Sequence, residues 1–334
     1  MYSANPMPEL VEQPSEERSD ALYTVVAGEG DGFLLAFAAG DSAGGAWELG
    51  YSATTEQATI VAYELIAHRS IDEQRLVRAL LELDGIEDEE PVYRAESAEF
   101  RMWLDRARAG RPVPSDEPSL DGATRATVVG VAHRRDPRRV VADSIALGRL
   151  FHSDASSVAA GVLAASAVAA SCFAQSGLDL IAGVGESVAG AMAHLSDGLH
   201  DTRRIASLPD RVSSLVRSVG VTTGEEALAA AGGGEEDPVG MILAGILLAA
   251  PVAHRHHIPI EQAARIGGSP LGAVVGAIVG ARVGIRAWPW AFANDTWFAE
   301  IGRRLVRGPD EVRDLPIPYA VEQHLMSGGR PGFH

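Results

Sequence analysis

Two carboxylates within one short glycine-rich segment are the first candidates for chemistry. Asp41 and Glu48 both lie in the stretch GDSAGGAWE, and Glu48 follows the glycine-rich part, where we expect a loop or helix edge. A carboxylate in a cleft acts as a general acid or base when burial raises its pKa. The structural alternatives are a helix cap or hydrogen-bond anchor for Asp41 and a solvated side chain for Glu48. The pair therefore predicts acid–base chemistry, with these alternatives left open.

Histidines form the second group of candidates. His152 and Asp154, in the sequence FHSD, have the residue types to contact a ligand, or to form the structural start of a helix. His254, His256 and His257 cluster in a way that suggests a metal site. However, they lie at the predicted C-terminal end of a helix, where cations are favourable without a metal. No carboxylate follows at a ligand spacing, so we predict no metal site at this cluster.

The elements that must position these residues are predicted to be helices. Ser70 and Glu73 have the spacing of a capping box, Asp136 precedes a proline as an N-cap would, and Asp154 precedes the charge-free stretch 155–175 in the same way. That stretch has the length of a membrane span, but its Ala- and Ser-rich composition favours a buried helix. Strict alternation of apolar and polar residues is scarce. The pattern therefore predicts an all-α protein.

One predicted helix carries glycines at every fourth position. Gly272, Gly276, Gly280 and Gly284 fall nearly on one helical face, so that a second helix is able to approach closely. We interpret this face as helix packing rather than as part of a site. Polar and proline-rich ends suggest a flexible acidic tail at residues 1–29, a single domain at 30–315 and a C-terminal tail at 316–334.

Composition excludes several classes of function. The chain has 334 residues and a formal charge of −17, and all 28 of its basic residues are arginines. A pI near 5.0 argues against binding to nucleic acid or to an anionic membrane. The single cysteine, Cys172, excludes an internal disulfide framework and a cysteine zinc site. We expect a cytoplasmic protein whose partner is a small molecule.

Three segments, in their order and spacing along the chain, resemble the ADP-ribosylglycohydrolase family, and two weaker matches lie between the second and the third. They are AFAAGDSAGGAWE (36–48), YSATTEQATIVAYELI (51–66), IEQAARIGGSPLGAVVGAIVGARVGIRAWP (260–289) and, more weakly, DGATRATVVGVAH (121–133) and FHSDASSVAAGVLAASAVA (151–169). The resemblance implies a compact orthogonal helical bundle and hydrolysis of an ADP-ribosyl glycosidic bond. It also implies two magnesium ions, which the family holds with a Thr-Asp-Asp-Thr run and a Gly-Gly-Asp-Thr-Asp run.

This chain departs from the family pattern at both magnesium-binding runs. The first reads Ser-Ala-Thr-Thr at 52–55, and the second reads Gly-Gly-Ser-Pro-Leu at 267–271, so that all four carboxylates are absent. Neutral hydroxyls do not offset the charge of two divalent cations, for which carboxylates are the usual ligands. We therefore predict no magnesium cofactor and no metal-ligating residues.

Other parts of the implied site are retained. Asp41 and Glu48 stand where the family has its acidic pair, which makes them the catalytic candidates. The segment from Gly122 to Arg125 resembles a phosphate-binding loop, although Asp121 replaces the usual Asn and a carboxylate is unfavourable beside a phosphate. The resemblance implies the following ligand-binding residues: Ser52, Thr54, Thr55, Glu56, Gly122, Ala123, Thr124, Arg125, His152, Asp154, Gly268 and Ser269.

Three functions remain open at the level of sequence. The first is a protein that binds ADP-ribose or a related nucleotide or metabolite without di-magnesium hydrolysis, and the lost carboxylates favour it. The second is a metal-independent enzyme that uses Glu48 and Asp41 on a glycosidic or related bond. The third is a structural or scaffolding protein. The sequence predicts no particular protein partner or oligomeric state.

Overall fold

The protein folds from helices. The computed structural model describes residues 30–46, 51–84, 93, 96–234, 236–251, 255–288, 294–310 and 312–316. In these residues the regular structure is helical, with two isolated β-bridges and no strand, so the predicted all-α class is confirmed. Of the predicted tails, residues 1–29 and 316–334, the structure describes only Pro316. The α-helices are α1 (Phe33–Asp41), α2 (Ala53–His68), α3 (Glu73–Asp84), α4 (Ala98–Arg108), α5 (Asp121–Ala132), α6 (Pro137–Phe151), α7 (Ala155–Ser171), α8 (Gly177–Leu195), α9 (Leu208–Ser214), α10 (Gly224–Ala230), α11 (Pro238–Ala249), α12 (His257–Val283) and α13 (Asp295–Arg307).

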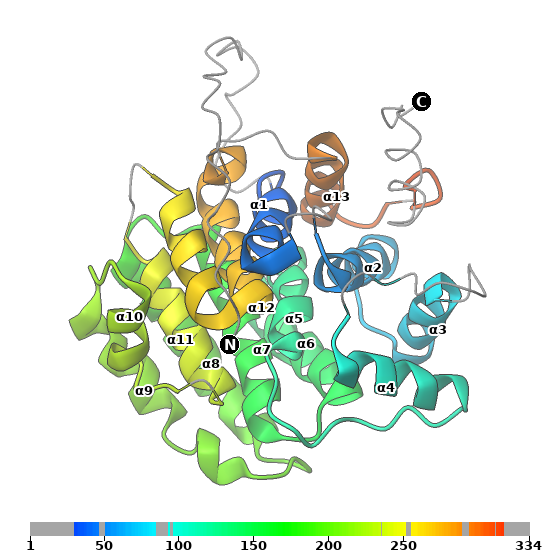
Figure 1. Cartoon of the computed structure of the whole chain (residues 1–334), viewed down its shortest axis with the longest axis horizontal. Helices are drawn as coiled ribbons and strands as arrows, with labels where there is room; N and C mark the ends of the chain where they lie inside the picture. The colour runs from blue at the N-terminus through cyan, green and yellow to red at the C-terminus, as the bar shows by residue number, and fades with distance from the viewer. Residues whose placement is uncertain are drawn as a thin grey trace, which may run out of the picture.

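The helices surround a central group formed by α5, α7, α11 and α12. In Figure 1, α3 and α4 lie on one side of this group, and α9 and α10 lie on the opposite side. Helix α12 packs along α1 and α11, while α7 packs against α5, α6 and α8. Segments far apart in the sequence therefore meet at the centre, since α1 comes from the beginning of the described chain and α12 from near its end.

Helices α1 and α12 approach so closely that their backbones touch. A Cβ atom added to Gly276 would lie 2.0 Å from the backbone oxygen of Ala36, and Gly272 and Gly280 meet the backbone of α1 in the same way. The approach needs a face without side chains, because a methyl group at Gly276 would overlap a backbone atom that cannot move aside. The predicted packing role is thus confirmed for Gly272, Gly276 and Gly280, whereas Gly284, with φ 69°, is the C-cap that follows α12 and is not part of this face.

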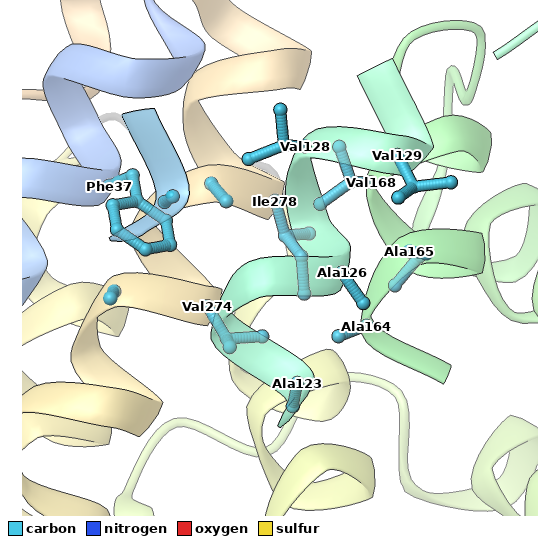
Figure 2. Close-up of a cluster of buried hydrophobic side chains, with 14 of the residues drawn as sticks. Phe37, Ala123, Ala126, Val128, Val129, Ala164, Ala165, Val168, Val274 and Ile278 are labelled. Carbon is cyan, nitrogen blue, oxygen red and sulfur yellow. The ribbon is translucent and has the colours of Figure 1, made fainter. Parts of the chain in front are cut away.

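The hydrophobic core is built largely from small side chains. All of α7 is buried except Ala170, which agrees with the prediction of a buried helix for this charge-free stretch. Alanine is the commonest buried apolar residue, followed by leucine and valine, and its small side chain lets neighbouring helices come close. Figure 2 shows the part of this core where α1, α5, α7 and α12 meet, with the labelled side chains Phe37, Ala123, Ala126, Val128, Val129, Ala164, Ala165, Val168, Val274 and Ile278.

Helix α12 is also the longest apolar segment of the described chain. Together with the following turn, as far as Ala287, it is long and apolar enough to cross a membrane by length and composition. In this fold 67% of its apolar window is buried against the rest of the protein. Its apolar character is therefore explained by its central place in the bundle.

Two of the three predicted helix N-caps, Asp136 and Asp154, are confirmed, and the third, Ser70, is not. Asp136 accepts a hydrogen bond from the Arg139 N–H at 3.2 Å, and Asp154 accepts one from the Ser157 N–H at 2.8 Å, as N-caps do. The predicted capping box at Ser70 is wrong. Asp72 stands immediately before α3 and accepts a hydrogen bond from the N–H of the third helical residue, so it occupies the capping position instead.

The histidine cluster lies at the N-terminus of a helix and not at a C-terminus. His256 is the N-cap of α12 and His257 its first residue, while His254 lies outside the described residues. The expectation of a helix C-terminus took Pro259 as a terminator. Pro259 in fact sits in the first turn of α12, where the missing N–H costs nothing. Burial lowers the pKa of His257, and at a helix N-terminus the helix dipole does not favour a cation.

Candidate functional site

A buried carboxylate at the end of α1 connects three helices. Asp41 Oδ2 accepts hydrogen bonds from the Ser52 N–H at 2.8 Å and from the Thr55 hydroxyl at 2.7 Å. Its other oxygen, Oδ1, accepts the Ser52 hydroxyl at 2.7 Å. The Thr55 N–H adds a longer contact of 3.3 Å to Oδ2. Asp41 therefore fixes the first turn of α2 against the end of α1.

The third helix reaches Asp41 through a break in α12. Gly268 has φ 63° and ψ −161°, which interrupts the helix at a conformation that L side chains rarely adopt. The next residue, Ser269, donates its hydroxyl to the backbone oxygen of Asp41 at 2.6 Å. The structure thus brings together Asp41, Ser52, Thr55 and Ser269, four residues that the sequence analysis named. We call these four residues the Asp41 cluster.

A buried arginine on α5 forms the centre of a second group. The Nε of Arg125 donates to the side-chain oxygen of Gln57 on α2 at 2.6 Å, and its guanidinium lies 3.9 Å from the ring centroid of Phe151. One oxygen of Asp121 lies 3.9 Å from Nη2 of Arg125. Burial lowers the pKa of Arg125 to about 10, so the guanidinium stays protonated at neutral pH.

The predicted phosphate loop is in fact helical. Gly122, Ala123, Thr124 and Arg125 all belong to α5, which begins at Asp121. The loop prediction rested on the small residues. A helix also accommodates Ala, Thr and Arg, and here the packing of α5 in the core decides for the helix. Thr124 donates its hydroxyl to the Asp121 carbonyl, a bond within the helix. The segment is therefore the first turn of a helix and carries the carboxylate of Asp121.

His152 stands beside Arg125 in the wall of a cavity of about 280 Å³. The imidazole is buried, and neither ring nitrogen has a hydrogen-bond partner. Burial, and then the charge of Arg125, lower its pKa to about 4. His152 is therefore neutral at pH 7. The cavity is lined by Glu99, Phe100, Met102, Trp103, Arg106, Val113, Ser115, Asp116, Glu117, Asp121, Arg125, Phe151 and His152.

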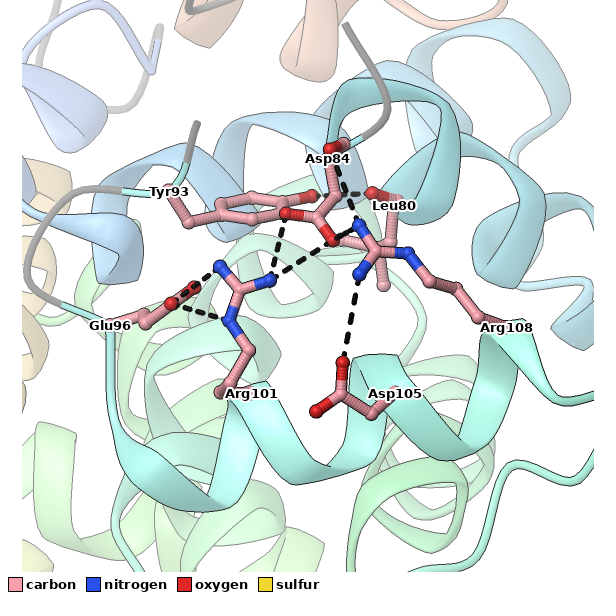
Figure 3. A network of polar contacts seen from close by, with 7 residues as sticks. All are labelled: Leu80, Asp84, Tyr93, Glu96, Arg101, Asp105 and Arg108. Atoms are coloured by element: carbon pink, nitrogen blue, oxygen red, sulfur yellow. Dashed lines mark hydrogen bonds and ion pairs between the residues drawn. The ribbon is translucent and has the colours of Figure 1, made fainter. Parts of the chain in front are cut away.

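One wall of this cavity is helix α4, which a polar network ties to α3. Asp84, at the end of α3, is buried and binds Arg101 of α4 at 3.2 Å, together with Arg108 of α4 (Figure 3). Arg101 also binds Glu96 at 2.5 Å. The network lies on one side of α4 and leaves Phe100 and Trp103 to face the cavity. Breaking such a buried ion network is costly, so the wall is held in place.

Comparison with known sequences identifies the family. The sequence model described as ADP-ribosylglycohydrolase matches residues 28–314, which is most of the chain. The chain belongs to the ADP-ribosylglycohydrolase family. Among solved structures, one titled "ADP-ribosylglycohydrolase-related protein complex" is similar with a TM-score of 0.60 and 18% identity, over 84% of this chain and 98% of that one. At this identity the similarity shows the fold alone. No protein of curated function matches the sequence significantly.

The residues of this ADP-ribosylglycohydrolase family member do not fit the family's two magnesium ions. Ala53, Pro270 and Leu271 offer no side-chain oxygen, and both oxygens of Asp41 already accept hydrogen bonds. Among the described residues, no group of three His, Cys, Asp or Glu side chains is arranged to hold a metal ion. Magnesium prefers carboxylates and demands octahedral geometry, which the remaining hydroxyls do not supply.

The other residues predicted for the site lie in several environments. Asp154 caps α7 and also accepts the Ser156 hydroxyl at 2.7 Å. Ala123 has its side chain in the core (Figure 2). Glu56 is buried in the first turn of α2, and the neighbouring Thr54 is half-buried. Glu48 lies outside the described residues. The site residues of the prediction therefore separate into the Asp41 cluster, the cavity around His152 and individual structural positions.

Sequence reasoning missed several residues that line the cavity. Phe100 and Trp103 lie on the apolar face of α4, whose spacing indicates a buried face but not what it faces. Gln57, which holds Arg125 but is not among the lining residues, carried no signal of its own, since their bond joins residues 68 positions apart. A larger groove of about 690 Å³ lies between α6 and α8, but it includes none of the predicted site residues. The smaller cavity is therefore the better candidate site.

Proposed function

We propose that this member of the ADP-ribosylglycohydrolase family binds ADP-ribose, or a related nucleotide or metabolite, without di-magnesium hydrolysis. The observation that carries the proposal is the state of Asp41. Its two oxygens are occupied by Ser52 and Thr55, so the acid is an anchor for helix α2 rather than a metal ligand. The fold of a hydrolase is kept, while the donors for its metals are replaced by neutral side chains.

The cavity beside His152 supports ligand binding. Its lining brings three aromatic side chains, Phe100, Trp103 and Phe151, together with polar and charged side chains around one space. Arg125 and His152 both lie in its wall and both lack part of their hydrogen bonding. Buried polar groups without partners are unfavourable unless water or a ligand completes them. A binding role therefore accounts for side chains that a purely structural role leaves unexplained.

A metal-independent enzyme is the second candidate, and it depends on Glu48. Asp41 is a poor general base here, because donating groups already surround its carboxylate. Turnover would then have to depend on Glu48. A scaffolding protein, the third candidate, predicts no small-molecule binding at all.

Calorimetric titration of ADP-ribose into the full chain separates these candidates. The titration is carried out with magnesium and again with a chelator. We expect the same affinity in both conditions and no release of product. Binding that requires magnesium would overturn the proposal, and so would the absence of binding to ADP-ribose, ADP and adenosine alike. Product release that survives the chelator and is lost in Glu48→Gln would establish the enzyme instead.

A further inference from the structure

Two residues in the wall of the cavity, Arg125 and His152, carry buried hydrogen-bonding atoms without partners. Nη1 of Arg125 and both ring nitrogens of His152 have no hydrogen-bond partner, although the two residues are only 2% and 3% exposed. Phe151 and Gln57 hold Arg125 so that it cannot turn away. Unpaired groups at this depth are unusual in folded proteins. They indicate a space that is completed by a ligand with matching groups.

His152 adds both a donor and an acceptor to this wall. The charged groups facing it are Arg125, Asp121 and Asp154, and the first of these, together with burial, keeps the ring neutral. A neutral imidazole carries one N–H and one bare nitrogen. Beside it, Arg125 offers an N–H donor only. A ligand edge with an acceptor next to a donor would therefore satisfy both residues.

The charges around the cavity disfavour an anion. Four carboxylates line it, from Glu99, Asp116, Glu117 and Asp121, against the guanidinium groups of Arg106 and Arg125, so the lining carries a formal charge of −2. The charge of Arg125 is already met in part by Asp121 at 3.9 Å. Burial, and then the charge of Asp121, raise the pKa of Glu99. A phosphate group would meet repulsion here.

The walls and the size of the cavity indicate a flat, compact group. Phe100, Trp103 and Phe151 provide aromatic surface, and Met102 and Val113 stand at its edge with 50% and 48% of their surface exposed. A volume of about 280 Å³ lies just below the range of sites that enclose a whole drug-sized ligand. One ring with a polar substituent therefore fits better than an entire dinucleotide-like molecule.

We infer that this cavity binds the uncharged, planar end of a ligand, a carboxamide or an amino-substituted nitrogen ring, rather than its phosphate groups. The acceptor of such an edge receives the free Arg125 N–H, and its amino group donates to the bare nitrogen of His152. The inference rests on the proposed function, since it concerns the same cavity, and it adds which part of the ligand enters. Any phosphates would remain outside the acidic lining.

Three ligands of nearly the same shape test separately the effect of the ligand's charge and of its hydrogen-bonding edge. Benzamide, benzoate and benzamidine have nearly the same shape and carry charges of about 0, −1 and +1 at pH 7. We expect benzamide to bind the full chain at least about tenfold more tightly than either ion. Tightest binding by benzoate would mean that Arg125 makes an anion site, and tightest binding by benzamidine would mean that the acids dominate. Either result, or binding by none of the three, would overturn the inference.

Two variants locate the binding to His152. His152→Leu removes only groups that lack partners, so we expect it to fold normally and to weaken benzamide binding about tenfold. In Gly122→Ala the new Cβ would lie 2.9 Å from the His152 ring, so the ring must move and affinity must fall. Gly190→Ala, with nothing within 4 Å, is the matched control and should bind like the wild type. Unchanged affinity in His152→Leu would contradict the assignment.

Failure of this inference is distinguishable from failure of the proposed function. If ADP-ribose binds but benzoate is preferred to benzamide, the protein is a binding protein whose cavity accepts anions. If benzamide binds through His152 while ADP-ribose and ADP do not, the assignment of the cavity holds, and the ligand is a metabolite without a diphosphate.

Discussion

Removing the Asp41 carboxylate tests whether this residue is an anchor or a chemical group. Asp41→Ala leaves the buried Ser52 N–H without a partner and deprives the hydroxyls of Ser52 and Thr55 of their acceptor. The Thr55 N–H keeps a second acceptor, the Ser52 carbonyl at 3.0 Å, and so loses little. An unpaired buried donor costs about 1–3 kcal/mol and each lost hydroxyl bond about 1 kcal/mol, which predicts a destabilisation of about 3–5 kcal/mol.

Asp41→Asn should give an intermediate loss of stability. The amide keeps one oxygen, so it retains the contacts of Oδ2 while it loses the acceptor for the Ser52 hydroxyl and the negative charge. We expect a loss of about 1–2 kcal/mol, between the wild type and Asp41→Ala. Asp210→Asn, at an exposed acid in the first turn of α9, is the control and should stay within about 0.5 kcal/mol.

Urea unfolding at pH 7, followed by circular dichroism, measures these differences as shifts of the transition midpoint at constant slope. The reasoning is refuted if Asp41→Ala lies within about 0.5 kcal/mol of the wild type. Asp41 would then be free for acid–base chemistry, and the enzyme hypothesis would gain support. Loss of stability in the predicted order, with ligand binding retained under conditions where the variants remain folded, confirms the anchor.

Three further measurements address the metal, the buried histidine and the helix packing. Magnesium should leave the melting temperature unchanged, because a cation that binds the native state would raise it; a clear increase would show a site built from other ligands. The pKa of His152 falls from 6.5 to about 4 on folding, so its contribution to stability is complete above about pH 6.5 and is lost as the pH drops to about 4, a change of about 3 kcal/mol. His152→Leu should flatten that part of the profile of stability against pH, and an unchanged profile would contradict the assignment. Gly276→Ala places a methyl carbon 2.0 Å from a backbone oxygen of α1 and should cost more than about 3 kcal/mol or prevent folding, whereas Gly190→Ala, which has open space around it, should stabilise the protein by up to about 1 kcal/mol. Equal stability of the two alanine variants in urea would refute the packing argument.

Local patterns in the sequence were enough for the class of fold and for much of its helical framework. Asp136 and Asp154 cap helices as their positions before apolar segments predict, because a capping bond joins residues only three apart. The four-residue spacing of Gly272, Gly276 and Gly280 predicts a helical face for close packing, since helical periodicity is a local property. The predictions for Ser70 and for the histidine cluster were wrong because Asp72 and Pro259 each admit more than one helical position.

The loss of the four family carboxylates is also visible in the sequence alone, because residue identity decides which ligands exist. The role of Asp41 was not visible: acid, base and anchor all use the same side chain. Its partners Ser52 and Thr55 stand 11 and 14 positions away, and the choice is made only when α2 begins beside the end of α1. The cavity is still less local, since Phe100 of α4, Arg125 of α5 and His152, the residue after α6, meet only through packing. Hydrogen bonds and burial between distant segments are properties of the folded chain, so the tertiary structure alone made Asp41 an anchor and His152 a buried, neutral and unpartnered group.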